Sequence, residues 1–253
     1  MTSPQVWGWG LYPWLLILIV VWMRIGILGG TGNMGGGLAL RFCLVHEVTV
    51  GSRSVEKAEE SARVLGAKAA GFYGSAMRGS IKGTLNEDAV EGRDLVIETL
   101  PASAAITTLT AIRDRFSDRQ IVVSCVVPMK RKGKLYTWSP VVAGGCDEAR
   151  SAAELIRDAV APVMVVSAFQ TIPADYLNDL EAVLDLDVLV AGDDEEAVEE
   201  VMGLARDIPG LRPLKVGPLE NSKWVESLTP LLLNAAILNH LHDPSIRIVP
   251  WSP

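Results

Sequence analysis

The chain has 253 residues, of which 49% are hydrophobic and 21% are charged, an ordinary composition for a globular protein with a sizeable core. This length suits one large domain, or a larger domain with a small companion. The formal net charge is −7, which argues against nucleic acid as the main partner.

The three cysteines are Cys43, Cys125 and Cys146, and their spacing does not match a metal-binding pattern such as CxxC. Two of them lie in apolar stretches, which favours buried free thiols. Nothing in this pattern requires an oxidising compartment, so we expect a cytoplasmic protein.

Residues 1–22 differ from the rest of the chain. Leu11–Trp22 is almost wholly apolar apart from Pro13, and no Lys or Arg occurs before residue 23, so the pattern is not that of a secretory signal. An apolar strand, Arg24–Leu28, follows without a linker. We therefore interpret Met23 as the start of the fold and residues 1–22 as an upstream extension. A membrane anchor, which needs about 20 apolar residues, stays open as the less favoured alternative.

Strand-like and helix-like segments alternate after Met23. The apolar runs of strand length are Ile25–Leu28, Val48–Val50, Leu95–Thr99, Ile121–Val126 and Met164–Ala168. The helical stretches between them are Met34–Leu44, Val55–Leu65, Ala104–Arg115 and Ala149–Val160. Continuously apolar strands indicate a sheet that is buried on both faces. The alternation therefore predicts an α/β fold of the Rossmann type, with a doubly wound parallel sheet.

The pattern continues beyond Pro173 as a smaller α/β unit. Its predicted elements are a strand at Val188–Ala191, a helix at Glu195–Asp207, a strand at Pro213–Val216 and a helix at Ser222–Leu241. Pro230 falls inside the last helix and should kink it. We expect a first domain over residues 23–175 and a small C-terminal domain over residues 176–253, packed against the edge of the sheet.

A glycine-rich motif follows the first strand. Gly30, Gly32 and Gly35 form GxGxxG between a predicted strand and a predicted helix, which is the context that a dinucleotide-binding motif requires. The first glycine permits a tight turn, the second lets the backbone approach a pyrophosphate, and the third allows close packing of helix on strand. The free N–H groups at the helix N-terminus then face the phosphates.

The end of the second strand distinguishes the two nicotinamide dinucleotides. NAD enzymes usually carry Asp or Glu there to bind the ribose 2′-hydroxyl. This chain has Ser52 and Arg53, with Lys57 one turn later. Arg53 can form two hydrogen bonds to a 2′-phosphate, Ser52 can donate a third, and Lys57 adds charge. The sequence therefore predicts NADP(H) as the cofactor.

The sequence contains few groups suited to acid–base catalysis. His46 lies at a turn and is interpreted as structural, and the pair His240 and His242 lacks a carboxylate, which makes it weak evidence for a metal. Asp193 and Glu196 are interpreted as a capping box at a helix start. We predict no catalytic side chain and no metal site. The pattern favours hydride transfer, in which the protein orients the reacting groups and excludes water from them.

One basic segment stands out in this acidic chain. Lys130, Arg131, Lys132 and Lys134 follow the fifth strand, at the edge where doubly wound sheets bind ligands. The segment can receive an anionic second substrate, or it can be a solvated loop.

Several of these sequences resemble one known family. They are Gly29–Ala39 (GGTGNMGGGLA), Gly51-Ser52-Arg53 with Lys57, Asn86–Ala89, and Gly210–Thr229 (GLRPLKVGPLENSKWVESLT). They are similar to the archaeal and bacterial NADPH-dependent coenzyme F420 reductases, also called 8-hydroxy-5-deazaflavin:NADPH oxidoreductases. The resemblance runs from about Arg24 to the last helix, and Gly210–Thr229 is its most specific part.

The resemblance implies that a hydride passes between C4 of the nicotinamide and C5 of the deazaflavin, in a cleft between the domains. It further implies that the segment Ala168–Pro173 lines the ring site together with Val127 and Pro128. The cofactor-binding residues expected from motif and resemblance together are Gly30, Thr31, Gly32, Asn33, Met34, Gly35, Ser52, Arg53, Lys57, Val127, Pro128 and Ala168.

The chain departs from the family pattern at two places. Gln170 stands where members often have His, and the loop after Pro101 lacks their bulky residues. Alternatives therefore stay open: reduction of an imine or ketone, a ferric reductase, or an NADPH-sensing module without catalysis. The apolar stretch Leu228–Leu238 can pack in a core or between subunits, and we expect a homodimer. The expected partners are thus small-molecule coenzymes and a second copy of the chain.

Overall fold

The computed structural model describes residues 21–140 and 150–249. The central sheet has eight strands in the order β10-β9-β8-β5-β4-β1-β2-β3. These strands are β1 (Arg24–Leu28), β2 (Glu47–Ser52), β3 (Ser80–Leu85), β4 (Leu95–Glu98), β5 (Ile121–Ser124), β8 (Met164–Ser167), β9 (Leu186–Gly192) and β10 (Leu211–Lys215). A separate two-stranded hairpin consists of β6 (Met129–Lys132) and β7 (Leu135–Trp138).

The helices connect the strands and cover the sheet. They are α1 (Asn33–Phe42), α2 (Val55–Tyr73), α3 (Ala102–Ala111), α4 (Ala152–Val160), α5 (Ala174–Asn178), α6 (Glu195–Arg206) and α7 (Ser222–Asn239). Three short 3₁₀ turns accompany them: η1 (Gly74–Ala76), η2 (Arg113–Arg115) and η3 (Leu219–Asn221).

The sheet has the predicted doubly wound topology. Strands β3, β2, β1, β4, β5 and β8 are all parallel, and the strand order reverses between β1 and β4. Strand β9 then pairs antiparallel with β8, and β10 pairs parallel with β9. The α/β Rossmann-type prediction is confirmed. The division between residues 23–175 and 176–253 stays a prediction, and the strands on its two sides share one sheet.

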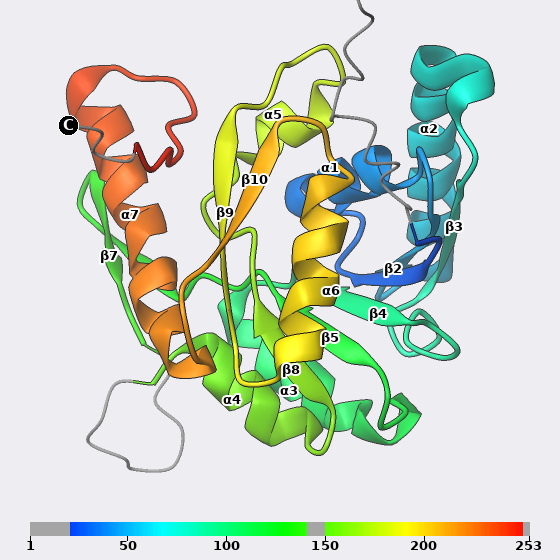
Figure 1. Cartoon of the computed structure of the whole chain (residues 1–253), viewed down its shortest axis with the longest axis horizontal. Helices are drawn as coiled ribbons and strands as arrows, with labels where there is room; N and C mark the ends of the chain where they lie inside the picture. The colour runs from blue at the N-terminus through cyan, green and yellow to red at the C-terminus, as the bar shows by residue number, and fades with distance from the viewer. Residues whose placement is uncertain (1–20, 141–149, 250–253) are drawn as a thin grey trace, which may run out of the picture.

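Two apolar clusters fill the space between the sheet and its helices. One contains side chains of α1, α2, α5 and α6, and the other contains side chains of α3 and α4. The two clusters lie on opposite faces, as the continuously apolar strands predict. Figure 1 shows α2 beside β3 at one end of the molecule, and α7 beside the hairpin strand β7 at the other.

Two elements differ from the sequence prediction. Strand β3 was not predicted, because SIKGTL is a half-buried edge strand whose Lys82 and Gly83 interrupt the apolar run. The basic segment is not a loop but the hairpin β6–β7, which turns at Gly133 with a φ of 66°. Glycine adopts this left-handed conformation without the steric cost of a Cβ.

The helix cap predicted before α6 is wrong by one residue. Asp194, not Asp193, is the N-cap, and its carboxylate accepts a hydrogen bond from the backbone N–H of Ala197 at 2.8 Å. The carboxylate of Asp193 instead accepts from the N–H of Leu219 at 2.9 Å. The predicted capping box is absent because Asp193 connects β9 to η3 rather than capping α6.

His46 has the structural role that was predicted for it. Its buried ring accepts from the N–H of Met23 at Nδ1, so Nε2 carries the proton and lies 3.0 Å from a carboxylate oxygen of Asp207. This pair ties the start of β1 to the end of α6. Cys43 and Cys125 are buried free thiols, as expected, whereas Cys146 lies outside the described residues.

The predicted upstream extension falls mostly outside the described residues, which begin at Val21. Val21 and Trp22 are exposed and precede β1 directly. Within the two described ranges, no helix combines the length and apolarity that a membrane crossing requires. Pro230 lies inside α7, as predicted, and its expected kink stays a prediction.

We expect Gly83→Ala to lower the free energy of unfolding by about 2–4 kcal/mol, because the added Cβ overpacks a rigid contact. An ideal Cβ at this position lies 2.2 Å from the backbone carbonyl atoms of Ala58. Gly66→Ala is the matched control, since a Cβ there meets nothing within 4 Å. That control should gain about 0.5–1 kcal/mol from helix propensity. Urea denaturation measures both, and equal stabilities would contradict the β2–β3–α2 packing.

Candidate functional site

The glycine motif brings α1 into close contact with β1 and β2. The N–H of Gly30 donates to the carbonyl of Gly51 at 3.0 Å, and a Cβ on Gly30 would lie 2.6 Å from the Cβ of Val50. A Cβ on Gly35 would lie 2.7 Å from the Cα of Gly30. Both glycines are therefore required by packing, as the motif predicts.

The N-terminus of α1 is open. Gly32 is the N-cap, no side chain caps the helix among the described residues, and the first turn has no acidic residue. Thr31, Gly32 and Asn33 are exposed. Backbone N–H groups in the first turn of such a helix are free to bind an anion, and the helix dipole favours one.

A cavity of about 630 Å³ lies beside this helix start, and we call it the cationic cavity. Its lining residues are Gly29, Thr31, Gly32, Ser52, Arg53, Ser54, Lys57, Asn86, Thr99, Leu100 and Pro101. The structure thus brings together five residues of the predicted site, namely Thr31, Gly32, Ser52, Arg53 and Lys57, from two separate segments. Gly30 and Gly35 are buried behind them.

The cations of this cavity come from the start of α2. Arg53 and Lys57 are exposed, and neither forms an ion pair with a described residue. Ser54 caps α2 and donates its hydroxyl to Glu56 at 2.6 Å, a contact that lowers the pKa of that carboxyl. Glu56 and Lys57 both line a neighbouring cavity of about 470 Å³. The cationic groups are therefore available to a phosphate.

Asn86 contributes to the cavity in a way that the motif did not predict. Its side-chain oxygen accepts from the N–H of Gly29 at 3.1 Å, and its own N–H donates to the carbonyl of Ser52 at 2.8 Å. Asn86 thus connects the glycine turn to the end of β2. Only the resemblance drew attention to its segment, because nothing in the local pattern distinguishes this Asn from a turn residue.

A second cavity of about 530 Å³ lies on the other side of the α1 start, and we call it the apolar cavity. Its lining residues are Met34, Cys125, Val127, Met129, Phe169–Asp175, Thr229, Leu232, Leu233, Ala236 and Leu241–Pro244. The set combines the ends of β5 and β8 with one side of α7. Met34 stands two residues after Gly32, so the two cavities flank one helix N-terminus.

The predicted ring-site residues divide into two groups here. Met34, Val127 and Phe169–Pro173 line the apolar cavity, whereas Pro128 and Ala168 do not. Pro128 is buried, and its carbonyl accepts from Ser139 at 2.9 Å. Ala168 lies in the core and donates its N–H to the carbonyl of Ser124. The contribution of α7 to this cavity was not predicted, because Thr229 lies 59 positions from Gln170 and the pattern of α7 alone does not show which segment it packs against.

Gln170 is firmly held at the wall of the apolar cavity. Its side-chain nitrogen donates to the carbonyl of Ser124 at 2.8 Å and to the hydroxyl of Ser167 at 2.7 Å. Its backbone carbonyl accepts from the hydroxyl of Thr229, which fixes α7 to this wall. The preceding Phe169 has a φ of 71°, a strained conformation that such contacts must maintain.

The basic hairpin extends from the same cavity. Val127 and Met129 line the cavity, and the exposed strand β6 carries its cations outward from there. Asn234 of α7 holds β7 by accepting from the N–H of Tyr136 at 2.7 Å and donating to its carbonyl at 2.8 Å. None of the four hairpin cations pairs with a carboxylate among the described residues.

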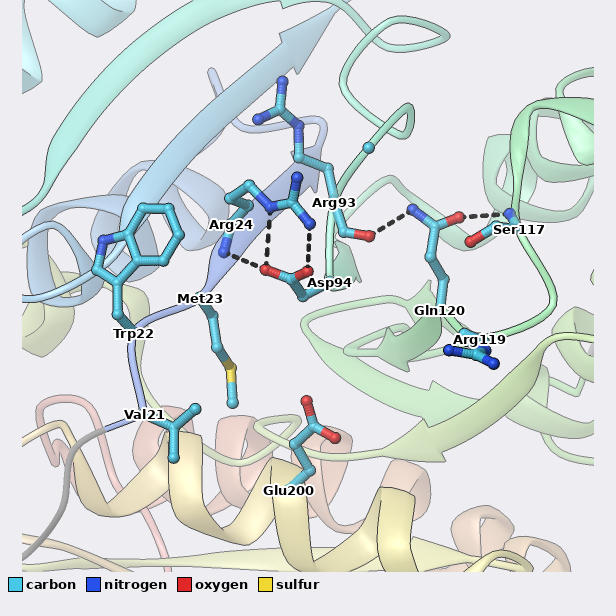
Figure 2. Close-up of a pocket in the computed structure, with 11 residues that line it drawn as sticks. Val21, Trp22, Met23, Arg24, Arg93, Asp94, Ser117, Arg119, Gln120 and Glu200 are labelled. Atoms are coloured by element: carbon cyan, nitrogen blue, oxygen red, sulfur yellow. Dashed lines mark hydrogen bonds and ion pairs between the residues drawn. The ribbon is translucent and has the colours of Figure 1, made fainter.

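A further cavity, of about 830 Å³, lies at the opposite edge of the sheet, beside the amino ends of β1 and β4 (Figure 2). The guanidinium of Arg24 pairs there with both carboxylate oxygens of Asp94, at 2.7 and 3.2 Å. The amide of Gln120 bonds the carbonyl of Arg93 and the N–H of Ser117. The polar groups named here bond to one another, and doubly wound sheets bind ligands at their carboxyl ends. This cavity is therefore not the candidate site.

The two C-terminal histidines, His240 and His242, directly follow α7. Within the described ranges, no three His, Cys, Asp or Glu side chains gather closely enough to hold a metal. His242 instead lines the apolar cavity, whereas His240 ends α7 with a φ of 56°.

Glu98 is a buried carboxyl at the end of β4. Its Oε1 accepts from the N–H of Leu100 at 2.6 Å, whereas its Oε2 has no partner. Burial raises the pKa of this carboxyl from 4.5 to about 8, against a smaller opposing effect of the Leu100 hydrogen bond. The side chain is therefore mostly protonated at neutral pH. The sequence offered no signal for it, because LVIE reads as an ordinary buried strand.

We expect Glu98→Gln to change how stability depends on pH. Between pH 4.5 and about 8 the unfolded chain has lost the Glu98 proton while the folded chain keeps it, so stability falls as pH rises through this window. Gln does not titrate. Relative to wild type, the variant should therefore gain about 3–5 kcal/mol between pH 4.5 and pH 8.5. Thermal or urea denaturation at both pH values measures the difference, and a pH-independent difference would contradict the buried, unpaired carboxyl.

Comparison with known proteins agrees with this geometry. The family model described as NADP oxidoreductase, coenzyme F420-dependent, matches residues 24–128. The F420-dependent NADP reductase of Methanothermobacter thermautotrophicus is 36% identical over 90% of this chain and 96% of its own length. The enzyme of the same name from Methanocaldococcus jannaschii is 37% identical over 89% of this chain and 98% of its own.

Among solved structures, a candidate F420-dependent NADP reductase from Arthrobacter sp. FB24 superposes with a TM-score of 0.72 at 23% identity. The match covers 90% of this chain and 100% of that one, which shows a shared fold. The sequence identities to the two archaeal enzymes go further and cover nearly the whole length of each protein. The chain belongs to the family of F420-dependent NADP reductases.

Proposed function

We propose that this protein is an oxidoreductase that transfers a hydride between NADP(H) and the deazaflavin coenzyme F420. The observation that carries the proposal is the pair of cavities on either side of the α1 N-terminus. One cavity offers cations and free backbone N–H groups, and the other is lined mainly by apolar side chains. The relatives over 30% identical are F420-dependent NADP reductases, which share this pair of substrates by name.

The residues of the cationic cavity fit NADP(H). The open helix start takes the pyrophosphate, with Thr31, Gly32 and Asn33 closest to it. Arg53 and Lys57 take the 2′-phosphate, and Ser52 donates a further hydrogen bond. The absence of a carboxylate at the end of β2 supports NADP(H) over NAD(H), and Glu56 faces the hydroxyl of Ser54. Hydride donation and acceptance are the chemistry that the bound nicotinamide supplies.

The apolar cavity suits two stacked rings. Met34 and Val127 line it, and Pro128 and Ala168 are buried beside its lining residues in the chain. Side chains of α7 form the opposite wall. This enclosure excludes water and orients the reacting carbons, which is the main contribution that a protein makes to hydride transfer. We propose no catalytic side chain in direct contact with the reacting atoms.

We propose that the two parts of the chain have different roles. Residues 23–175 bind NADP(H), and residues 176–253 cover the apolar cavity through α7. We also propose a homodimer, supported by exposed apolar side chains on α7 such as Trp224, Leu231 and Leu238, which are 62–65% exposed. The cytoplasmic location stays a proposal, supported by the buried free thiols Cys43 and Cys125.

A spectrophotometric assay of the purified chain with NADPH and a panel of acceptors tests the proposed function. The panel contains F420, a cyclic imine, a ketone and a ferric chelate. We expect NADPH to be oxidised when F420 is the acceptor and not with the other three acceptors. Faster turnover with the imine, ketone or ferric acceptor would replace F420 by that substrate class. NADPH binding without turnover against any acceptor would identify a sensing module instead.

Arg53→Ala should weaken NADPH binding by about 10- to 100-fold and leave NADH binding nearly unchanged, because a charge-assisted contact to the 2′-phosphate is lost. Arg63→Ala is the matched control, since Arg63 is an exposed arginine on the helix α2 that follows Arg53, and it pairs with Glu60 outside the cationic cavity. Fluorescence titration measures the four affinities. Equal wild-type affinities for NADPH and NADH would exclude the proposed 2′-phosphate site.

Replacing the four hairpin cations by Ser should raise KM for F420 several-fold, because the coenzyme carries an anionic phosphodiester and glutamate tail. The affinity for NADPH and kcat should stay close to wild type, because the ring site lies elsewhere. Exposed contacts are individually weak, so the effect should also shrink as salt increases. The control replaces four exposed cations far from both cavities, namely Arg63, Lys82, Arg113 and Arg206. A KM that is unchanged at every ionic strength would make the hairpin a solvated surface.

A further inference from the structure

Glu98 occupies the position between the two cavities. It pairs in register with Leu28 of β1 and Ser124 of β5, at the point where the strand order reverses. The three residues after it, Thr99 to Pro101, line the cationic cavity. Next to it, Cys125 and Val127 follow Ser124 and line the apolar cavity. Glu98 itself lines neither cavity, but its neighbours in the strand and in the sheet line both.

Among the described residues, no cation forms an ion pair with Glu98 or contributes to its pKa. The hydroxyl of Ser124 and the side-chain oxygen of Gln170 are, like Oε2 of Glu98, buried without a partner. Neighbouring α3 has no titratable residue, and β1 contributes Leu28 at this level. The charged residues of α4, Glu154, Arg157 and Asp158, engage in ion pairs or hydrogen bonds elsewhere.

The remaining titratable neighbours do not neutralise Glu98. Burial raises the pKa of the Cys125 thiol, and repulsion from ionised Glu98 raises it further. The carboxyl of Glu226 on α7 is turned to the N–H groups of Ala152 and Ala153 at 3.0 and 3.2 Å. Glu98 is thus a buried titratable group that has no charged partner among the described residues.

The two forms of the cofactor differ by one positive charge on the nicotinamide ring, which is cationic in NADP⁺ and neutral in NADPH. A buried carboxylate is stabilised by a nearby cation and destabilised when that charge disappears. At an effective dielectric constant of about 20, a unit charge roughly 10 Å away changes a pKa by about one unit. The carboxyl edge of β4 and β5 is where doubly wound sheets bind ligands.

We propose that Glu98 couples proton uptake to the redox state of the nicotinamide, being ionised beside NADP⁺ and protonated beside NADPH. The reaction that the family name implies releases one such proton. When the reduced deazaflavin gives its hydride to NADP⁺, a C–H bond breaks with its electron pair and one N–H proton is also lost. At pH 7.5 Glu98 takes up about half of this proton as the nicotinamide charge disappears and the rest passes to solvent, so atoms and charge are conserved. Glu98 acts through its electric field and is a positioning residue, not one in contact with the substrates.

This inference rests on the proposed NADP(H) site, but its test needs no deazaflavin. Isothermal titration calorimetry at pH 7.5, in buffers of different ionisation enthalpy, counts the protons released on binding. NADP⁺ should release about half a proton more than NADPH, a value expected for a pKa that falls from about 8 to about 7. Comparing the two forms cancels the 2′-phosphate, which both carry. The ratio of the NADP⁺ to the NADPH dissociation constant should also fall roughly sevenfold between pH 6.5 and pH 9.

Glu98→Gln keeps an oxygen for the N–H of Leu100 and imitates the protonated acid. In this variant the difference in proton release should vanish, and the affinity ratio should become independent of pH. Glu226→Gln is the matched control, because it removes the other buried carboxyl with a raised pKa, of about 7, outside both cavities. That control should behave as wild type. Equal proton release for NADP⁺ and NADPH in wild type, or an unchanged difference in Glu98→Gln, would overturn the proposal.

A failure of this kind is distinguishable from a failure of the proposed function. Absence of NADP⁺ and NADPH binding would remove the cofactor site itself and overturn both. Normal binding without the proton difference would overturn the role of Glu98 alone. Lack of turnover with F420 leaves the binding experiment intact, because only NADP(H) is titrated.

Discussion

The close approach of α1 to β1 and β2 is the constraint on which the rest of the site depends. No side chain fits between Gly30 and Val50, where an added Cβ would lie 2.6 Å away. This contact sets the start of α1 directly above the carboxyl end of β1. A second approach, at Gly51, leaves room for Asn86 to hold the N–H of Gly29. Because the glycines let the backbones of α1, β1 and β2 approach closely, the open helix N-terminus and the cations after β2 line the same cavity.

The distribution of charge follows from this frame. The chain carries a net charge of −7, yet unpaired cations stand on both sides of the apolar cavity. Arg53 and Lys57 lie on one side, and the hairpin β6–β7 lies on the other. The lining of the apolar cavity itself contains no Arg or Lys among the described residues. Anionic ends can thus be held at the two cationic sites, while the reacting rings stay in a region of low dielectric constant.

The parts of the site that sequence could predict are those whose chemistry is local. The GxGxxG motif follows an apolar strand, Ser52, Arg53 and Lys57 follow the next one, and each group is recognisable within a few residues of chain. The elements that carry them form as expected. Other features depend on residues far apart. Asn234 holds β7 across 98 positions, and Thr229 fixes Gln170 across 59, so no pattern within either segment predicts them. The hairpin β6–β7 was not predicted for the same reason, because α7, which lies far away in the sequence, holds β7 in place.

Glu98 differs from the buried carboxylates of Asp187 and Glu226 in the hydrogen bonds that its oxygens accept. Asp187 is fully buried, but Arg212, Arg247 and the N–H of Ile248 bind it, and the Arg212 hydrogen bonds hold the pKa of this carboxyl below its usual range. Glu226 is bound by two N–H groups of α4. Only Glu98, of these three, has an oxygen without a partner. An unpaired buried acid costs stability that Leu or Gln would recover, so its presence at the strand reversal conflicts with packing alone. Residues that lower stability in this way are found most often at functional sites, and the neighbours of Glu98 line the two cavities.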